Sequence, residues 1–428
     1  MLASFCWLDV TRRNRAEKPS CAGGGHARRN GNLAALAAHD RGDELQDIAP
    51  GSRAKVEVPS SPRLDRIVAT YRVQCETGAI EARAQAIAIE QSVELPLEAI
   101  EDPRILDHIV GQVVAIEQRN PGLFDVRIAL SAETMPPEPG QLLNMLFGNT
   151  SLLSDVTLQD VDVPDSYLRE LGGPTVGLAG LRKMLRVPAR GLTATALKPQ
   201  GLPAVELAKI AHAAALGGID IIKDDHGLAN QAYSPFIARV VACAAAVARA
   251  NRSTGRVSAY APSLSGSLDQ LRDQISVVRD AGLKMALIAP MVVGLPAFHA
   301  IAEEATDIAF LAHPSLGGAS RIAPPLLLGK IFRMLGADAT IFPNYGGRFS
   351  YSAQTCLDIA AAARAPWGSL KVCAPAPAGG MSLERVSEML DAYGRDTILL
   401  IGGSLLSHRA GITGAAETFA TKVARHGQ

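Results

Sequence analysis

Eight short apolar runs recur through the second half of the chain at nearly even spacing, and this repeat constrains the fold more than any other feature. Each run ends near a polar or glycine residue, and successive ends lie 24 to 37 residues apart. That distance fits one strand followed by one helix, as in a βα unit. The runs are TATAL (193–197), IDIIK (219–223), VSAYAP (257–262), MALIAP (285–290), IAFLAHP (308–314), ATIFPN (339–344), LKVCAP (370–375) and TILLIGG (397–403).

The runs are apolar along their whole length, which indicates strands buried on both faces and therefore a parallel sheet. Helical stripes lie between them, for example Leu268, Leu271, Ile275 and Val278. Eight such units match a TIM (β/α)8 barrel, a fold that takes about 250 residues. An open doubly wound sheet is the alternative, but LKPQG (197–201) stands where that fold would carry GxGxxG.

The sequence ahead of the barrel predicts a small α+β domain of ferredoxin-like type. We expect residues 61–173 to form it and residues 174–428 to form the barrel domain. Residues 1–60 contain RRNR, GGG and RRNGN without a lasting period, and they predict a disordered tail or an upstream-extended translation start. The small domain is expected to contain strands at 66–73, 111–118 and 122–130 and helices at 77–91 and around 141–146.

Charge and cysteine usage limit the partners. The chain holds 42 Lys or Arg and 42 Asp or Glu, so it lacks the basic excess typical of proteins that bind nucleic acid or membrane surfaces. The six cysteines include no CxxC pair, which indicates reduced thiols. No apolar run reaches the roughly 18 residues of a membrane span. We therefore expect a cytoplasmic protein with neither nucleic-acid nor membrane partners.

The end of the second barrel strand carries the strongest chemical signal, because barrel enzymes place their chemistry at the carboxyl ends of the strands. Lys223 follows a buried run, and Asp224, Asp225 and His226 follow it at once. Burial lowers the pKa of a lysine and makes the amine reactive. Oxygen ligands suit Mg²⁺, and a carboxylated lysine would add one more. The structural alternative is an ion pair between Lys223 and one of the aspartates.

Two glycine-containing segments follow strands seven and eight, where barrels often bind phosphate through backbone N–H groups. The alternative is that these glycines only turn the chain. Lys198 follows strand one and is a candidate proton donor, or else a solvated loop lysine. His313 follows strand five and is either a site residue or a hydrogen-bonded structural histidine. The phosphate candidates are Gly379, Gly380, Gly402, Gly403 and Ser404.

These segments resemble the RuBisCO large-chain superfamily. The resemblance covers residues 63–423 and keeps the order of the motifs, which makes the set far more specific than any one member. The matching segments are AIEQS (88–92), FGNTS (147–151), ALKPQGL (196–202), GGIDIIKDDHGLANQ (217–231), PAGGM (377–381) and IGGSLLSH (401–408).

The resemblance implies a homodimer with shared active sites, or a larger oligomer, that acts on a phosphorylated small molecule. It implies Mg²⁺ held by Asp225, His226 and a Lys223 that CO₂ has converted to a carbamate. It also implies catalytic roles for Lys198, Lys223 and His313, and substrate contacts from Glu90 and Asn149 of the partner chain. The glycine segments would bind phosphate.

Several positions depart from the family pattern. His226 stands where the family usually has Glu, Gln200 replaces a second lysine, and Pro314 replaces a phosphate-binding arginine. The long sixth loop with its lysine is replaced by FPNYGGRFS (342–350), in which Arg348 is the candidate substitute. Fixation of CO₂ on ribulose bisphosphate is therefore not expected, and the chain resembles a RuBisCO-like protein.

The missing arginine suits a substrate with one phosphate. We expect an enzyme that stabilises an enediolate, namely a 3-oxo-isoapionate 4-phosphate decarboxylase or transcarboxylase/hydrolase. The alternatives are the diketo-methylthiopentyl-phosphate enolase and the methylthioribulose-phosphate isomerase of methionine salvage. A reading from another class is an inert homologue that binds a sugar phosphate as a regulator.

Overall fold

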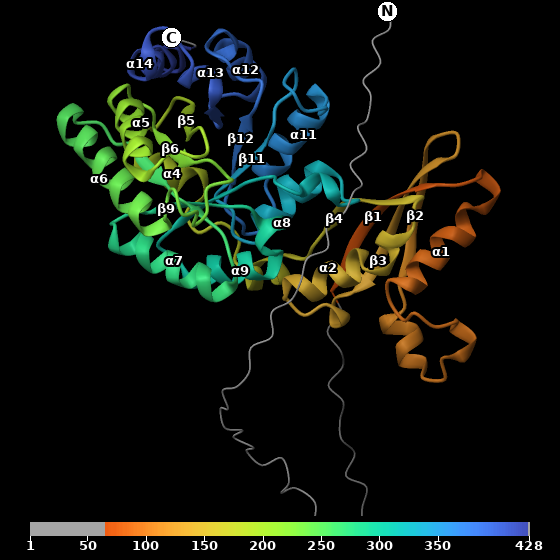
Figure 1. The fold of residues 1–428 in the computed structure, drawn as a ribbon. Coiled ribbons are helices and arrows are strands. Elements are labelled where there is room, and N and C mark those ends of the chain that lie inside the picture. Colours follow the sequence, from red (N-terminus) through yellow and green to blue (C-terminus); the bar gives the residue numbers. More distant parts are fainter. Residues whose placement is uncertain (1–64, 427–428) are drawn as a thin grey trace, which may run out of the picture. The chain divides into compact units, whose positions relative to one another are not determined.

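The computed structural model describes residues 65–426, so the prediction of a tail at residues 1–60 lies outside the described residues. Two separate sheets are present (Figure 1). The smaller has four antiparallel strands in the order β2-β3-β1-β4. Their bounds are β1 (Arg66–Gln74), β2 (Gln112–Asn120), β3 (Leu123–Ser131) and β4 (Val156–Asp162).

The alternating pattern of β1 explains how this sheet is covered. Ile67, Ala69, Tyr71 and Val73 are buried, and the residues between them are half-buried. The predicted strands and helices are confirmed, whereas β4 was not predicted from the sequence. Its residues, VTLQDVD, mix polar and apolar side chains too evenly to stand out. The helices here are α1 (Ile80–Glu90), α2 (Pro139–Phe147) and α3 (Asp165–Leu171).

The larger sheet is the predicted parallel barrel. Its nine strands run in the order β7-β6-β5-β13-β12-β11-β10-β9-β8. Because β7 and β8 are two pieces of one segment on either side of Pro262, the ring amounts to eight βα units. The bounds are β5 (Leu192–Leu197), β6 (Ile221–Asp224), β7 (Ala259–Ala261), β8 (Ser263–Leu264), β9 (Met285–Ile288), β10 (Ala309–Ala312), β11 (Ala339–Pro343), β12 (Ala374–Ala378) and β13 (Ile398–Leu400).

One predicted strand begins later than expected. The run LKVCAP was expected to form strand seven, but β12 starts at Ala374 and continues through Pro375 and Pro377. Proline lacks the N–H that a ladder needs, so a sequence reading discounts such a segment. The consequence is that Gly379 and Gly380 follow the strand directly.

Helices surround the strands of the barrel (Figure 1). Within the described residues, no helix is both long and apolar enough to span a lipid bilayer. The helices of this region are α4 (Gly177–Leu185), α5 (Ala204–Leu216), α6 (Phe236–Thr254), α7 (Leu268–Asp280), α8 (Pro290–Val293), α9 (Leu295–Glu304), α10 (Phe332–Met334), α11 (Ala353–Arg364), α12 (Val386–Tyr393), α13 (Gly403–Leu406) and α14 (Gly411–Arg425).

Alternate strand residues fill the barrel interior and form a hydrophobic cluster separate from the one under the outer helices. Leu192 and Ala194 of β5 and Ile221 of β6 belong to this inner cluster. Leu178 and Leu181 of α4 pack against it, so α4 covers the end of the barrel where the strands begin. The opposite end, where the strands finish, is left for polar side chains.

Candidate active site

A cavity of about 460 Å³ lies at the carboxyl ends of the barrel strands. Its floor continues the inward-facing residues of the strands by one more step. Ala196 and Lys198 continue β5, Lys223 and Asp225 continue β6, and His313 follows β10 in the same alternation. The strand period of two therefore brings side chains 115 residues apart (198 to 313) into one cavity.

Lys223 is the most buried cation of the cavity. Its exposed fraction is 3%, and its Nζ donates a hydrogen bond to the main-chain oxygen of Asp224 at 3.0 Å. Its neighbours in register on the two adjacent strands are Ala196 and Ala261, whose small side chains leave room for it. Burial lowers the pKa of Lys223 to about 8, with the Asp225 carboxylate opposing and the Lys198 ammonium reinforcing that shift.

Asp225 is the carboxylate that the surrounding cations share. It accepts a hydrogen bond from Lys198 Nζ at 2.6 Å on one oxygen and contacts His226 Nδ1 at 3.3 Å on the other. Burial alone would raise its pKa, but the bonds from His226 and Lys198 and the charge of Lys223 outweigh burial and hold the pKa well below its ordinary value. Asp225 is thus ionised and poised as an anionic ligand.

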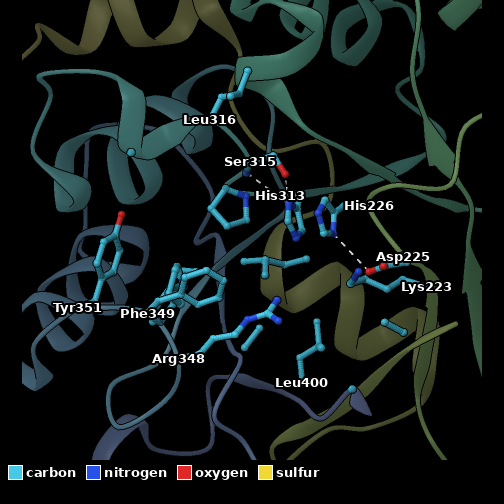
Figure 2. A pocket seen from close by; sticks show the side chains of 18 of the residues that line it. Lys223, Asp225, His226, His313, Ser315, Leu316, Arg348, Phe349, Tyr351 and Leu400 are labelled. Carbon is cyan, nitrogen blue, oxygen red and sulfur yellow. Dashed lines mark hydrogen bonds and ion pairs between the residues drawn. The ribbon is translucent and has the colours of Figure 1, made fainter. Parts of the chain in front are cut away.

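His226 and His313 stack face to face, with ring centroids 4.2 Å apart and planes 8° apart (Figure 2). His313 Nδ1 lies 2.8 Å from the hydroxyl of Ser315. Burial, together with the charges of Lys223 and His226, lowers the pKa of His313 to about 2. His313 is therefore neutral, so one of its ring nitrogens can accept a hydrogen bond.

Asp224 points away from the cavity and forms a fully buried ion pair with Arg239 of α6. The Arg239 Nε lies 2.9 Å from Asp224 Oδ2, and both side chains are 0% exposed. Tyr260 donates its hydroxyl to the other carboxylate oxygen at 2.7 Å, and the Ser263 N–H donates to Oδ2 at 3.0 Å. The pair fixes the end of β6, and alternation then directs Lys223 and Asp225 inward.

Arg239 also holds the segment that follows His226. Its Nη1 donates to the main-chain oxygen of Ser234 and its Nη2 to that of Ala229, both at 2.7 Å. One guanidinium thereby connects the strand end with the loop that leads from Asp225 to α6. No local pattern predicts this role, because Arg239 lies 15 residues from its partner within a helix rich in alanine.

The glycine segments meet around the cavity, but only one of the predicted phosphate residues lines it. Gly402 belongs to the lining, and Lys198 Cε would lie 3.8 Å from a Cβ placed there. Gly379 and Gly380 have φ of +79° and +66°, which favours glycine. Ser404 donates its hydroxyl to the main-chain oxygen of Met381 at 2.9 Å, which joins the two segments.

The far side of the cavity is apolar. Leu316 and Phe349 line it although they are 59% and 46% exposed. Phe349 and Tyr351 lie across the cavity from Lys223 and Asp225 (Figure 2). The sequence reading missed Leu316, Phe349 and Tyr351, because single apolar residues in a loop form no pattern. A search for apolar residues beside the predicted Arg348 and His313 would have found them.

Arg348 lines the cavity as predicted. Its guanidinium carbon lies 4.9 Å from the centre of the Phe349 ring, and it has no carboxylate partner among residues 65–426. It is therefore a cation available to an anionic ligand.

Glu90 and Asn149 are brought together although they are 59 residues apart. Asn149 Nδ2 donates to Glu90 Oε1 at 3.0 Å. Neither residue lines the cavity of its own chain. Their predicted role, contact with the substrate of a second chain, stays a prediction.

The donors around Asp225 fit Mg²⁺ only in part. Within residues 65–426, no group of three His, Cys, Asp or Glu side chains is arranged to hold a metal ion. Asp225 and His226 supply one anionic oxygen and one imidazole, and the neighbouring Lys223 is a cation in its ammonium form. The set fits Mg²⁺ once a carbamate on Lys223 replaces that positive charge with a second anionic oxygen donor.

A protein-family comparison decides the family. The model of the ribulose bisphosphate carboxylase large chain, catalytic domain, matches residues 177–426, which is more than half of the chain. The chain belongs to the RuBisCO large-chain family. Its departures at the predicted catalytic positions are those of a RuBisCO-like protein.

Three relatives define its place in this family. A crystal structure of a Rubisco-like protein from Rhodopseudomonas palustris is 54% identical, with a TM-score of 0.80, and the match covers 85% of this chain and 99% of that one. The 5-methylthioribulose-1-phosphate isomerase of Rhodospirillum rubrum is 56% identical over 84% of this chain and 96% of its own length. The 2,3-diketo-5-methylthiopentyl-1-phosphate enolase of Geobacillus kaustophilus is 30% identical over 83% and 91%.

The Asp224–Arg239 pair generates a stability prediction. Arg239→Met should lower the free energy of unfolding by about 3–5 kcal/mol, because it leaves the Asp224 carboxylate buried without a counter-charge. Arg279→Met is the matched control, since its pair with Asp307 is about 40% exposed on both sides and should contribute about 0–1 kcal/mol. Urea unfolding measures both. Equal midpoints for the two variants would contradict the anchoring role.

Proposed function

We propose that the protein is an isomerase of 5-methylthioribulose-1-phosphate or a closely similar methylthio sugar phosphate. The observation that carries the proposal is the two-ended cavity, polar at Lys198, Lys223 and Asp225 and apolar at Leu316 and Phe349. A sugar phosphate that ends in a methylthio group likewise has one polar end, the phosphate and hydroxyls, and one apolar end, the methylthio group. The 56% identity to the Rhodospirillum rubrum isomerase supports it.

This proposal takes the place of the 3-oxo-isoapionate 4-phosphate reaction expected from the sequence. That substrate is polar along its whole length and gives the apolar side of the cavity nothing to bind. The expectation of one phosphate is retained, because Pro314 and Leu316 line the cavity where the resemblance implied a second phosphate-binding cation.

Different residues of the cavity would bind the two ends of the substrate and transfer the proton. Arg348 and the backbone around Gly402 bind the single phosphate, and Leu316, Phe349 and Tyr351 bind the methylthio end. Isomerisation of a keto sugar removes a proton from a carbon beside the carbonyl and returns one at the neighbouring carbon. Lys198, whose Nζ lies at the cavity beside Asp225, is the proposed proton carrier. His313 orients a substrate hydroxyl.

Mg²⁺ would be held by Asp225, His226 and carbamylated Lys223. When bound, the metal would polarise the substrate carbonyl as a Lewis acid. The lowered pKa of Lys223 supports the carbamate, since only a neutral amine attacks the carbon of CO₂, releasing one proton as the N–C bond forms. In the second chain of a proposed homodimer, Glu90 and Asn149 would complete the site.

The second candidate is the enolase of 2,3-diketo-5-methylthiopentyl-1-phosphate. The same apolar side favours it, because that substrate also carries a methylthio group. The 30% identity to the Geobacillus kaustophilus enzyme supports it less strongly than the 56% identity supports the isomerase.

A substrate panel tests the proposal. The purified protein should turn over 5-methylthioribulose-1-phosphate with a higher kcat/KM than the diketo substrate or 3-oxo-isoapionate 4-phosphate. Leu316→Ser should lower kcat/KM for the methylthio substrate about tenfold, since it removes an apolar contact, and should leave ribulose 1-phosphate unaffected. Preference for the oxo-isoapionate phosphate would refute the assignment.

Removal of the Lys223 amine tests the metal and the carbamate together. In bicarbonate buffer, calorimetry should show Mg²⁺ binding to the parent protein, and Lys223→Ala should abolish both binding and turnover. Lys209→Ala is the control, since Lys209 is an exposed lysine paired with Glu206 on α5. Full activity of Lys223→Ala would exclude the carbamate.

A further inference from the structure

We propose that Arg385 is a positioning residue that ties the loop after β11 to the glycine pair after β12 and so holds Arg348 at the cavity. Arg385 lies in the short 3-10 helix Leu383–Arg385 that precedes α12, and it is not among the cavity lining. Its effect on turnover rests on the proposed function, whereas the tether itself does not.

The tether consists of two hydrogen bonds from one nitrogen. Arg385 Nη1 donates to the main-chain oxygen of Tyr345 at 3.1 Å and to that of Gly380 at 2.9 Å. Tyr345 belongs to the loop after β11 and Gly380 to the loop after β12. The guanidinium carbon also lies 5.3 Å from the centre of the Tyr345 ring, a cation–π contact.

The other edge of the guanidinium is fixed by Glu388. Nε and Nη2 each lie 2.9 Å from one carboxylate oxygen, and the arginine side chain is 22% exposed. This two-point pair sets the plane of the guanidinium. Glu388 therefore aims Nη1 at the two loop carbonyls, and a lysine, with no planar fork, could not reproduce this arrangement fully.

The two loops touch through glycine backbone. A Cβ on Gly380 would lie 2.3 Å from Gly347 Cα, and one on Gly347 would lie 2.9 Å from Gly380 N. A Cβ at Gly379 would meet the Phe349 ring at 3.6 Å. The same two segments are also joined by the Asn344 N–H, which donates to the Ala378 oxygen at 2.9 Å, and by Asn344 Nδ2, which lies 3.3 Å from Met381 Sδ. Arg385 adds hydrogen bonds that join Tyr345, two residues before Gly347, to Gly380 at the contact itself.

The bridge between the two loops determines where Arg348, the residue after Gly347, is held. Among residues 65–426 the Arg348 guanidinium contacts the Phe349 ring but no carboxylate, so its place at the cavity depends on the main chain that carries both residues. By fixing that main chain against the loop after β12, Arg385 holds the Arg348 cation at the cavity, which Gly402 also lines. A single phosphate would be bound between Arg348 and the backbone around Gly402.

Limited trypsin digestion tests the tether directly, because Arg348 is itself a cleavage site. In Arg385→Met, cleavage after Arg348 should be about tenfold faster than in the parent, the effect of losing roughly 1.4 kcal/mol of loop hydrogen bonding. Arg385→Lys should lie between the two. Mass spectrometry of the fragment that begins at Phe349 gives the rate.

Arg182→Met is the matched control. Arg182 also donates to main-chain oxygens, those of Val187, Arg190 and Arg395, and also pairs with an acid, Asp396, but it lies on α4 at the other end of the barrel. Trypsin should cleave Arg182→Met after Arg348 at the same rate as it cleaves the parent. Equal rates for the parent, Arg385→Met and Arg385→Lys would overturn the proposal.

Inorganic phosphate provides the second measurement. Calorimetry should show about tenfold weaker phosphate binding to Arg385→Met than to the parent, with Arg182→Met unchanged. Unchanged binding to Arg385→Met would also overturn the proposal. If the parent fails to isomerise any methylthio sugar phosphate but the digestion rates differ as described, the proposed function fails and the tether stands.

Discussion

The buried ion pair between Asp224 and Arg239 is the interaction on which the geometry of the site depends. Both side chains are fully buried, and Tyr260 completes the hydrogen bonds of the carboxylate. Because successive strand residues point to opposite sides, fixing Asp224 outward fixes Lys223 and Asp225 inward. The cost of burying two charges is offset by this close pairing, by the Ser263 N–H that donates to the carboxylate, and by the main-chain oxygens of Ser234 and Ala229 that accept from the guanidinium.

The same alternation assembles the rest of the cavity. The inner residues of each strand form an apolar cluster that α4 covers at one end, and the next inward residues at the other end are Lys198, Lys223, Asp225 and His313. Burial lowers the pKa of Lys223 to about 8 and keeps His313 neutral, whereas hydrogen bonds from His226 and Lys198 and the nearby cations lower the pKa of Asp225 and keep it ionised. Loops contribute the remaining groups. Arg348 is the cation proposed to bind phosphate, and Leu316 and Phe349 form the apolar side of the cavity.

The sequence allowed the barrel and the polar floor to be predicted because both follow from periodicity. An apolar run that ends in Lys223 and Asp225 specifies which side chains face inward. The start of β12 was predicted too early, because Pro375 and Pro377 are atypical of a strand. The strand β4 was not predicted, because its polar and apolar residues do not alternate clearly. The partners of Arg239 and Arg385, and the apolar residues of the loops, depend on tertiary contacts that no local pattern encodes.

The central claim is that this cavity isomerises a methylthio sugar phosphate. The most direct measurement follows 5-methylthioribulose-1-phosphate with the purified protein, Mg²⁺ and bicarbonate by ³¹P NMR and mass spectrometry. The account predicts a new phosphate-ester resonance from a product of unchanged mass. An unchanged substrate, release of inorganic phosphate, or a product that has lost CO₂ or water would contradict it.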